Sequence, residues 1–266
     1  MSVLKTLLKL VGLLLAALLV LVAAYVFWLS GSSHQPQNLQ SSTGYVSQSG
    51  PVLVFGGNRA TGLEIVKQLR ARGETVIVAV RPSSNIDALT ELGVETVIAD
   101  ALDPESVDAA LAATSYAAVI STLGTARGEK HQRPDFIGNR NVIDAAVRAG
   151  VRRLILITVV GAGDSAAAAP LPARNFLAEV IELKTQAEDH LRSSGLDYTI
   201  IRPGGLGDLS ATGTAVLAED PAAFSYISRI DLAQVTVDAL GNPATIGKTL
   251  AAYDPSRKTM WKMLKD

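Results

Sequence analysis

Residues 51–62 read PVLVFGGNRATG and decide the fold of most of the chain. The apolar run PVLVF predicts a strand at 51–55, and the glycines after it predict a tight turn into a helix over 60–72. A strand, a glycine-bearing turn and a helix in this order favour a dinucleotide-binding loop, because free amides at the helix N-terminus can bind a pyrophosphate. Gly56 permits the turn, and Gly62 lets the helix lie close to the strand. The alternative is an ordinary turn between a strand and a helix.

The alternation of strand and helix continues along the chain. Further β-branched runs predict strands at 75–81, 95–100, 117–123, 152–160, 197–203 and 248–254. Helices are predicted between them at 86–92, 104–112, 135–149, 177–194 and 230–240. Near-continuous apolar strands that alternate with helices indicate an α/β fold, with a doubly wound parallel sheet covered on both faces. We therefore expect one Rossmann-type domain over 51–255, followed by a C-terminal tail over 256–266.

The first fifty residues differ from the rest. From 10 to 29 the sequence reads LVGLLLAALLVLVAAYVFWL, without a single charge. As a helix, a run of this length spans about 30 Å, the thickness of the hydrocarbon core of a bilayer. It predicts a transmembrane anchor over 1–30, and the alternative is a cleaved signal peptide, whose apolar region is usually shorter. Residues 31–50 are rich in Ser, Gln and Gly and predict a flexible linker.

Two considerations about the membrane side oppose each other. Lys5 and Lys9 precede the apolar run, which by the positive-inside rule favours a cytoplasmic N-terminus and a domain on the other side. A domain that binds a nicotinamide cofactor is expected where the pool of that cofactor is. We favour the cytoplasmic side for the domain of this single-pass protein.

Composition excludes several classes of function. The formal net charge is −1 and no basic run occurs, so no nucleic acid is expected as a partner. The chain has no cysteine, which excludes disulfides, thiolate catalysis and cysteine-bound metals. Its three histidines, His34, His131 and His190, are far apart in the sequence, and no metal site is expected.

Several segments resemble one superfamily. FGGNRATG (55–62) is similar to the TGxxxGxG loop of short-chain dehydrogenase/reductases, with Ala60 in place of the middle glycine. DFIGNRNVIDAAVRAGVRRLILIT (135–158), GLDYTIIRPGGLGD (195–208) and YISRIDLAQ (226–234) resemble its atypical, NmrA-like branch. Within that branch, the segment over 205–233, GLGDLSATGTAVLAEDPAAFSYISRIDLA, resembles the C-terminal part of the flavin reductase and biliverdin reductase B group. The resemblance covers 51–253.

The end of the second predicted strand favours NADP(H) over NAD(H). NAD-selective domains place an acid there that binds the ribose 2′-hydroxyl. This strand ends at Val80 and Arg81 instead, and a guanidinium can pair bidentately with a 2′-phosphate. Arg59, in the glycine-bearing loop, is a second candidate for that phosphate. The alternative for each is a solvated surface arginine.

The other candidate cofactor ligands also follow predicted strands. The loop after the first strand contributes Gly56, Gly57, Asn58, Arg59, Ala60, Thr61 and Gly62. The resemblance implies that Asp100 and Ala101 lie beside the adenine. It also implies that Ser121, Thr122, Leu123 and Gly124 run past the phosphates and the nicotinamide ribose. Thr158 and Lys184 are candidates for both cofactor binding and catalysis.

The proton relay of typical short-chain dehydrogenases is incomplete. In those enzymes a lysine lowers the pKa of a tyrosine four residues before it on the same helix, and the tyrosine protonates the carbonyl oxygen. Lys184 occupies the lysine position, but Val180 occupies the tyrosine position, and Thr158 lies near the expected serine. Carbonyl reduction through a tyrosine is therefore not expected. The alternative for Lys184 is an exposed helical lysine.

Reduction of a flavin, quinone or tetrapyrrole does not require that tyrosine. It mainly requires an open apolar slot over the nicotinamide, and the protons can come from solvent. Residues 161–165 and 203–205 would line that slot. Arg127, Lys130, His131 and Arg133, in the loop over 125–133, either contact an anionic substrate or belong to a solvated loop. Asp164 is an acid catalyst or, more commonly, a turn cap. Arg202 is expected to anchor the rim of the sheet.

These inferences lead to one predicted function and two alternatives. The prediction is a membrane-anchored, NADPH-dependent reductase of a small-molecule acceptor such as a flavin or quinone. The first alternative is a module that senses NADP(H) without turnover, which the missing tyrosine favours. The second is a structural or assembly subunit of a membrane complex, which the anchor and linker favour.

Overall fold

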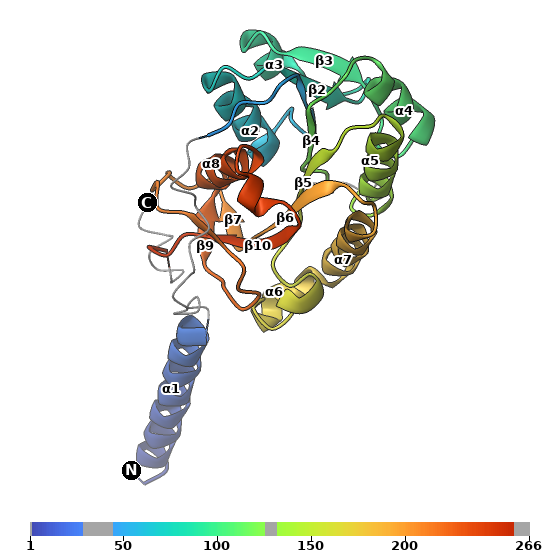
Figure 1. Cartoon of the computed structure of the whole chain (residues 1–266). Helices are drawn as coiled ribbons and strands as arrows, with labels where there is room; N and C mark the ends of the chain where they lie inside the picture. The colour runs from blue at the N-terminus through green and yellow to red at the C-terminus, as the bar shows by residue number, and fades with distance from the viewer. Residues whose placement is uncertain (1, 29–44, 126–131, 258–266) are drawn as a thin grey trace.

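A computed structural model describes residues 2–28, 45–125 and 132–257 of the chain. Helix α1 (Ser2–Trp28) extends away from the α/β domain (Figure 1). Its segment Lys5–Tyr25 is long and apolar enough to cross a membrane, and none of it is buried against the domain. A signal sequence near the N-terminus can meet the same criterion, so the helix is compatible with both an anchor and a signal.

An eight-stranded sheet forms the centre of the domain, in the order β3-β2-β1-β4-β5-β6-β10-β8. Its strands are β1 (Val52–Phe55), β2 (Val76–Val80), β3 (Glu95–Ile98), β4 (Ala118–Ser121), β5 (Arg153–Ile157), β6 (Asp197–Pro203), β8 (Val216–Ala218) and β10 (Lys248–Tyr253). Every neighbouring pair is parallel except β10 with the edge strand β8. A separate parallel pair joins β7 (Gly205–Gly207) and β9 (Tyr226–Ser228).

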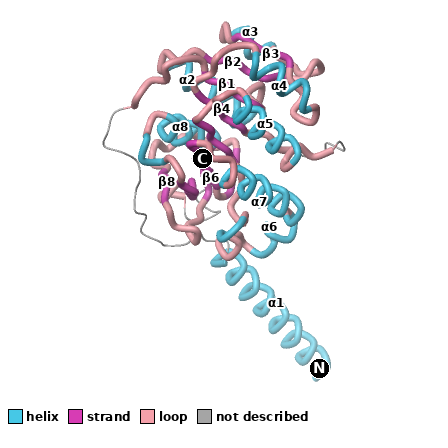
Figure 2. Tube along the Cα trace, turned by 45° about the vertical axis from the view of Figure 1, so that its right-hand side comes forward, coloured by secondary structure: helices cyan, strands magenta, loops and turns pink. Residues whose placement is uncertain are grey.

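Helices cover both faces of this sheet. The helices of the domain are α2 (Ala60–Ala71), α3 (Asp87–Glu91), α4 (Pro104–Ala112), α5 (Ile137–Arg148), α6 (Leu171–Phe176), α7 (Ala178–Arg192) and α8 (Arg229–Leu240), with 3₁₀ turns η1 (Gly163–Ser165) and η2 (Pro243–Thr245). Helices α2 and α8 pack side by side on one face, while α4, α5 and α7 cover the other (Figures 1 and 2). The predicted doubly wound α/β fold is confirmed.

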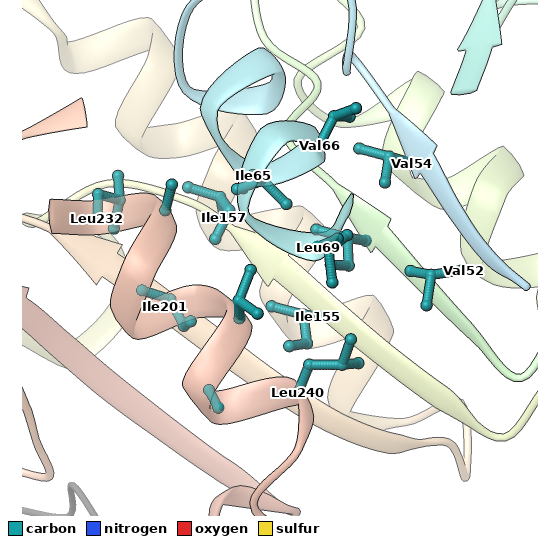
Figure 3. Packing of buried hydrophobic residues seen from close by; sticks show 14 of the residues in the cluster. Val52, Val54, Ile65, Val66, Leu69, Ile155, Ile157, Ile201, Leu232 and Leu240 are labelled. Atoms are coloured by element: carbon teal, nitrogen blue, oxygen red, sulfur yellow. The ribbon is translucent and has the colours of Figure 1, made fainter. Parts of the chain in front are cut away.

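The two hydrophobic cores follow from the two-residue period of the strands. In β1, Val52 and Val54 face α2 and α8, as Figure 3 shows, while Leu53 and Phe55 face the other helical layer. All four side chains are buried. Burying each such side chain contributes about 1.5–3 kcal/mol, so both helical layers are held to the sheet by its alternating residues.

Some elements differ from the sequence prediction. The strand predicted at 152–160 ends at Ile157, and the one predicted at 95–100 ends at Ile98. After β3 the chain turns, because the Asp100 carboxylate accepts a hydrogen bond from the Leu102 amide at 3.0 Å. The patterns did not predict α6, β7, β8 or β9. These strands have three residues each, too few to show a period.

The chain is fixed to the domain from Tyr45 onward, within the range predicted as a linker. The Tyr45 hydroxyl donates to the buried Glu74 carboxylate at 2.9 Å, and the Ser47 hydroxyl donates to the same oxygen at 2.8 Å. The Arg72 guanidinium lies 4.5 Å from the centre of the Tyr45 ring. Burial and the neighbouring Glu74 carboxylate raise the pKa of Tyr45, so its hydroxyl stays a donor. At the other end, Ser256 and Arg257 also pack onto the domain, through Asp254.

Candidate cofactor and active site

The turn after β1 brings three backbone segments into close contact. Gly56 has φ +78°, and a Cβ there would lie 2.6 Å from the Thr122 hydroxyl. A Cβ on Gly62 would lie 2.1 Å from the carbonyl oxygen of Gly56. Only glycine permits this approach, which leaves the N-terminus of α2 open above the end of β1. Ala60, which replaces the middle glycine of the family loop, has the left-handed φ of +48°.

The carboxyl ends of five parallel strands place the candidate cofactor residues on one rim. Strand β1 lies between β2 and β4, so the loop over 56–62 lies at the point where the strand order reverses. The Thr122 amide donates to the carbonyl of Phe55 at 3.0 Å, and its hydroxyl contacts the carbonyl of Gly56 at 3.2 Å. The structure thus brings the glycine-bearing loop together with residues 121–124 after β4.

The residues proposed for the adenosine half surround the ends of β2 and β3. Arg81 is exposed immediately after β2, and no acid occupies that position. Arg59 is exposed at the N-cap of α2. Asn58 reaches the loop after β2, where its amide donates to the carbonyl of Asn85 at 3.4 Å. Ala101 is buried, and it lies with Leu123 around Gly138, where a Cβ would contact both side chains.

Lys184 is not the exposed helical lysine that was the alternative prediction, because it is only 5% exposed. Its ammonium donates to the carbonyl of Leu123, and to that of Ile157 at 3.3 Å. It also lies 3.8 Å from the Asp135 carboxylate. Burial lowers the pKa of Lys184, while the nearby Asp135 and Glu188 carboxylates oppose that shift. Lys184 therefore joins the segment after β4 to the end of β5.

A buried polar chain that the sequence patterns did not predict supports the same segment. The Ser121 hydroxyl donates to the Asn139 side-chain oxygen at 2.6 Å, and the Asn139 amide donates to the carbonyl of Asp135 at 2.7 Å. The Asp135 carboxylate in turn accepts from both the amide and the hydroxyl of Thr125. Asp135 lies in the turn before α5, and Asn139, four residues later, lies in the first turn of that helix. The short spacing between these two polar residues was the sequence signal that could have identified them.

A second cluster holds Thr158. Its hydroxyl donates to the fully buried Glu188 carboxylate at 2.7 Å. Glu188 also accepts from Arg202 at 3.0 and 2.6 Å and from Arg192 at 2.9 Å. Glu188 follows Lys184 by four residues, and this position on the buried side of α7 could have identified it.

Arg202 anchors the rim, as predicted, and it also forms an ion pair with Asp164. The Arg202 guanidinium pairs with both Glu188 and Asp164. Its hydrogen bond holds the pKa of Asp164 below the usual range for a carboxyl, despite the opposing effect of burial. Asp164 is thus held as a carboxylate partner of Arg202, a pairing that neither prediction, acid catalyst or cap of a helix or turn, included.

The predicted substrate loop is described only in part. Arg127, Lys130 and His131 lie outside the described residues. Arg133 forms an ion pair with Glu179 at 3.0 Å, at the start of α7. Within residues 2–28, 45–125 and 132–257, no three His, Asp or Glu side chains are grouped to hold a metal ion.

The strand order, the glycine turn after β1 and the polar rim together define a dinucleotide-binding α/β domain. A family model described as NAD(P)H-binding matches residues 56–243, and the chain belongs to this family. The predicted resemblance to the NmrA-like, atypical short-chain dehydrogenase/reductases is thereby confirmed.

Solved and curated relatives include reductases. The structure of ChuY, an anaerobilin reductase of Escherichia coli O157:H7, is 34% identical with a TM-score of 0.69, and the match covers 78% of this chain and 98% of that one. An uncharacterised chloroplastic protein of Arabidopsis thaliana is 33% identical over 199 residues, which is 71% of each chain. The sanguinarine reductase of Eschscholzia californica is 36% identical over 121 residues, or 42% of each chain.

Proposed function

We propose that this protein is an NADPH-dependent reductase of a flavin, quinone or similar conjugated small molecule, held at a membrane by α1. The observation that carries the proposal is that the glycine loop contacts Thr122 and Lys184 holds the adjacent Leu123 carbonyl, while Val180 occupies the tyrosine position. The similarity to an anaerobilin reductase and a sanguinarine reductase supports a reductase. Both names describe reduction, and neither acceptor is assigned to this chain.

The loop residues fit a dinucleotide. A Cβ at Gly56 or Gly62 would fill the space over the turn, so the glycines leave it open to a pyrophosphate facing the amides of α2. Exposed Arg59 and Arg81 would bind the 2′-phosphate of NADP(H). Asp100 and Ala101 would lie beside the adenine, and residues 121–124 beside the phosphates and ribose. Bound NADPH supplies a hydride to the acceptor.

The chain's own groups would orient the reactants and leave proton delivery to solvent. Lys184 holds the carbonyls of Leu123 and Ile157, which fixes the floor under the ribose. Val180 has no proton to donate at the usual tyrosine position, and the hydroxyl hydrogen of Thr158 is directed to Glu188. A flat conjugated acceptor, whose reduced form takes a proton from water, suits this arrangement better than a simple ketone does.

We further propose that α1 is an uncleaved anchor and that the domain lies on the cytoplasmic side. The apolar run from 10 to 29 is longer than a usual signal h-region. Intact mass measurement of the membrane-extracted protein tests the first part, because a cleaved signal would remove about 3 kDa. Protease accessibility of the domain in sealed inside-out vesicles tests the second, and protection there would overturn it.

The reductase proposal is tested by titrating the full chain, in mild detergent, with NADPH and with NADH while nicotinamide fluorescence is followed. FMN and a short-chain quinone are then added. We expect tighter binding of NADPH, and oxidation when an acceptor is added. Arg81→Ser should reduce the preference for NADPH, whereas Arg148→Ser, an exposed arginine paired with Asp108 on another helix, should not. No binding of either nucleotide would overturn the proposal.

A second candidate function is an NADP(H) sensor without turnover, which Val180 favours. The same titration separates the two. Tight binding of NADPH and NADP⁺ with different affinities, and no oxidation with any acceptor, would support the sensor. If a stoichiometric partner also copurifies from membranes in mild detergent, a subunit of a membrane complex is favoured instead.

A further inference from the structure

Helix α6 leaves two large apolar side chains exposed. None of its six residues is buried. Phe176 is 79% exposed, more than any other large apolar side chain among the described residues, and Leu171 is 50% exposed. The sequence of α6, LPARNF, has one charge, the cation of Arg174. The helix thus offers an aromatic ring, an aliphatic side chain and a cation to whatever lies outside it.

The place of α6 in the fold connects this surface with the candidate site. It follows the loop over 161–170, whose first part is the predicted wall of the slot, and immediately precedes α7, which carries Lys184. Arg174 ties the helix to that loop by a hydrogen bond to the carbonyl of Ala166 at 3.3 Å. Figures 1 and 2 both show α6 at the end of the domain toward α1.

We propose that α6 contacts the lipid surface of the membrane that holds α1, with Phe176 and Leu171 entering the interface. This inference rests on the proposed anchoring by α1. An aromatic ring beside a cation is the composition that membrane interfaces favour, since the ring enters the boundary and the cation meets anionic headgroups. Such a small surface would bind lipid weakly alone, but attachment through α1 keeps it at a high local concentration beside the bilayer.

The contact would also place the slot next to the bilayer. Residues 161–165 lie only a few positions before α6, so a lipid-soluble acceptor could enter from the membrane without crossing bulk water. Among the acceptors proposed above, this geometry favours a quinone with an apolar tail over a free flavin.

The absence of cysteine makes the contact measurable at single sites. Phe176→Cys, Val147→Cys and Leu18→Cys in the full chain are each labelled with the fluorophore NBD and reconstituted in phosphatidylcholine–phosphatidylglycerol vesicles, with or without a nitroxide-labelled lipid. Val147 is the matched control, because it is 46% exposed but lies near the end of α5, at the opposite edge of the sheet. Leu18 lies within the apolar run of α1 and reports anchoring.

We expect the nitroxide lipid to quench the labels at positions 18 and 176 at least about twofold more than the label at 147. Quenching at 18, with equal quenching at 176 and 147, would overturn the contact and leave the anchor intact. Equal quenching at all three would overturn the anchor as well. The NBD fluorescence at position 176 could instead change with the protein-to-lipid ratio and not with the nitroxide lipid. That result would assign the surface to a second copy of the chain and would also overturn the inference.

A paired substitution tests whether Phe176 makes the contact. A label at Leu171→Cys should lose its quenching when Phe176→Ser is added, and keep it when Val147→Ser is added. Both serines replace exposed side chains, so the far-UV circular dichroism and thermal unfolding of the two proteins should stay the same. Unchanged quenching in the Phe176→Ser protein would contradict the role given to this ring.

Discussion

Replacing Glu188 by glutamine removes one charge and leaves the shape of the side chain almost unchanged. The carboxylate is fully buried and accepts hydrogen bonds from Arg202, Arg192 and Thr158. An amide in its place would turn donor hydrogens toward a guanidinium, and Arg202 would keep only Asp164, which lies mostly in solvent. Removing one partner of a buried ion pair costs about 3–5 kcal/mol. Since Asp164 remains, we expect the lower end, about 3 kcal/mol, or roughly a hundredfold in the folding equilibrium.

The measurement is urea unfolding of the full chain in mild detergent, followed by far-UV circular dichroism. Helix α1 should remain helical in the detergent, so it adds a constant background. Glu182→Gln is the control, because Glu182 is exposed on the same helix and accepts a hydrogen bond from Gln186, its neighbour one turn along. It should change stability by less than about 0.5 kcal/mol. A cost below about 1 kcal/mol for Glu188→Gln would refute the reasoning that charge holds this cluster together.

Gly62→Ala should lower stability by about 1–3 kcal/mol and weaken NADPH binding, because its Cβ would lie 2.1 Å from the Gly56 carbonyl oxygen. Gly50→Ala, whose Cβ meets nothing within 3.5 Å, should change neither in the same unfolding and fluorescence assays. Ala60→Gly should stabilise the protein by up to about 1 kcal/mol, since φ is +48° there, and a loss of stability would contradict this. Burial alone would raise the pKa of Asp254, but hydrogen bonds from three hydroxyls hold it below its usual value. The stability from Asp254 should therefore be complete above about pH 4 and be lost as pH falls through the folded-state pKa. Urea unfolding of the wild type and Asp254→Asn should differ most near about pH 7 and converge in acid, and a constant difference would count against this account.

The sequence predicted the elements that carry a long or well-marked pattern. The helix expected at 104–112 is α4, with Pro104 at its first turn and the Asp103 side chain accepting from the amide of Glu105. Strand β1 and the turn after it were also predicted, because an apolar run followed by glycines is a local signal. The strands β7, β8 and β9 were not, since three residues show no period and their pairing depends on the finished sheet.

The residues of the candidate site that lie at strand ends could be predicted from the sequence. The contacts between distant segments of the chain could not. Residues at strand ends, such as Arg81 and Thr158, could be placed on one rim from the strand order alone. The contacts that fix them join distant segments: Ser121 with Asn139, and Thr158 with Glu188 thirty residues later. Periodicity shows which face of α7 is buried, but only the packed structure shows that this face carries ion pairs.

The attachment of Tyr45 to Glu74 determines how far the domain can turn relative to α1. Glu74 lies just before β2, at the amino edge of the sheet, whereas the rim and α6 lie beyond the carboxyl edge. Residues 29–44 join α1 to this point, and fully extended they span at most about 55 Å. That length exceeds the depth of the sheet, roughly 20 Å, so the domain can rotate until its carboxyl edge meets the bilayer. A connection of half that length would leave little slack for this rotation. The spacing between anchor and attachment point therefore allows the side of the domain that carries α6 to reach the lipid.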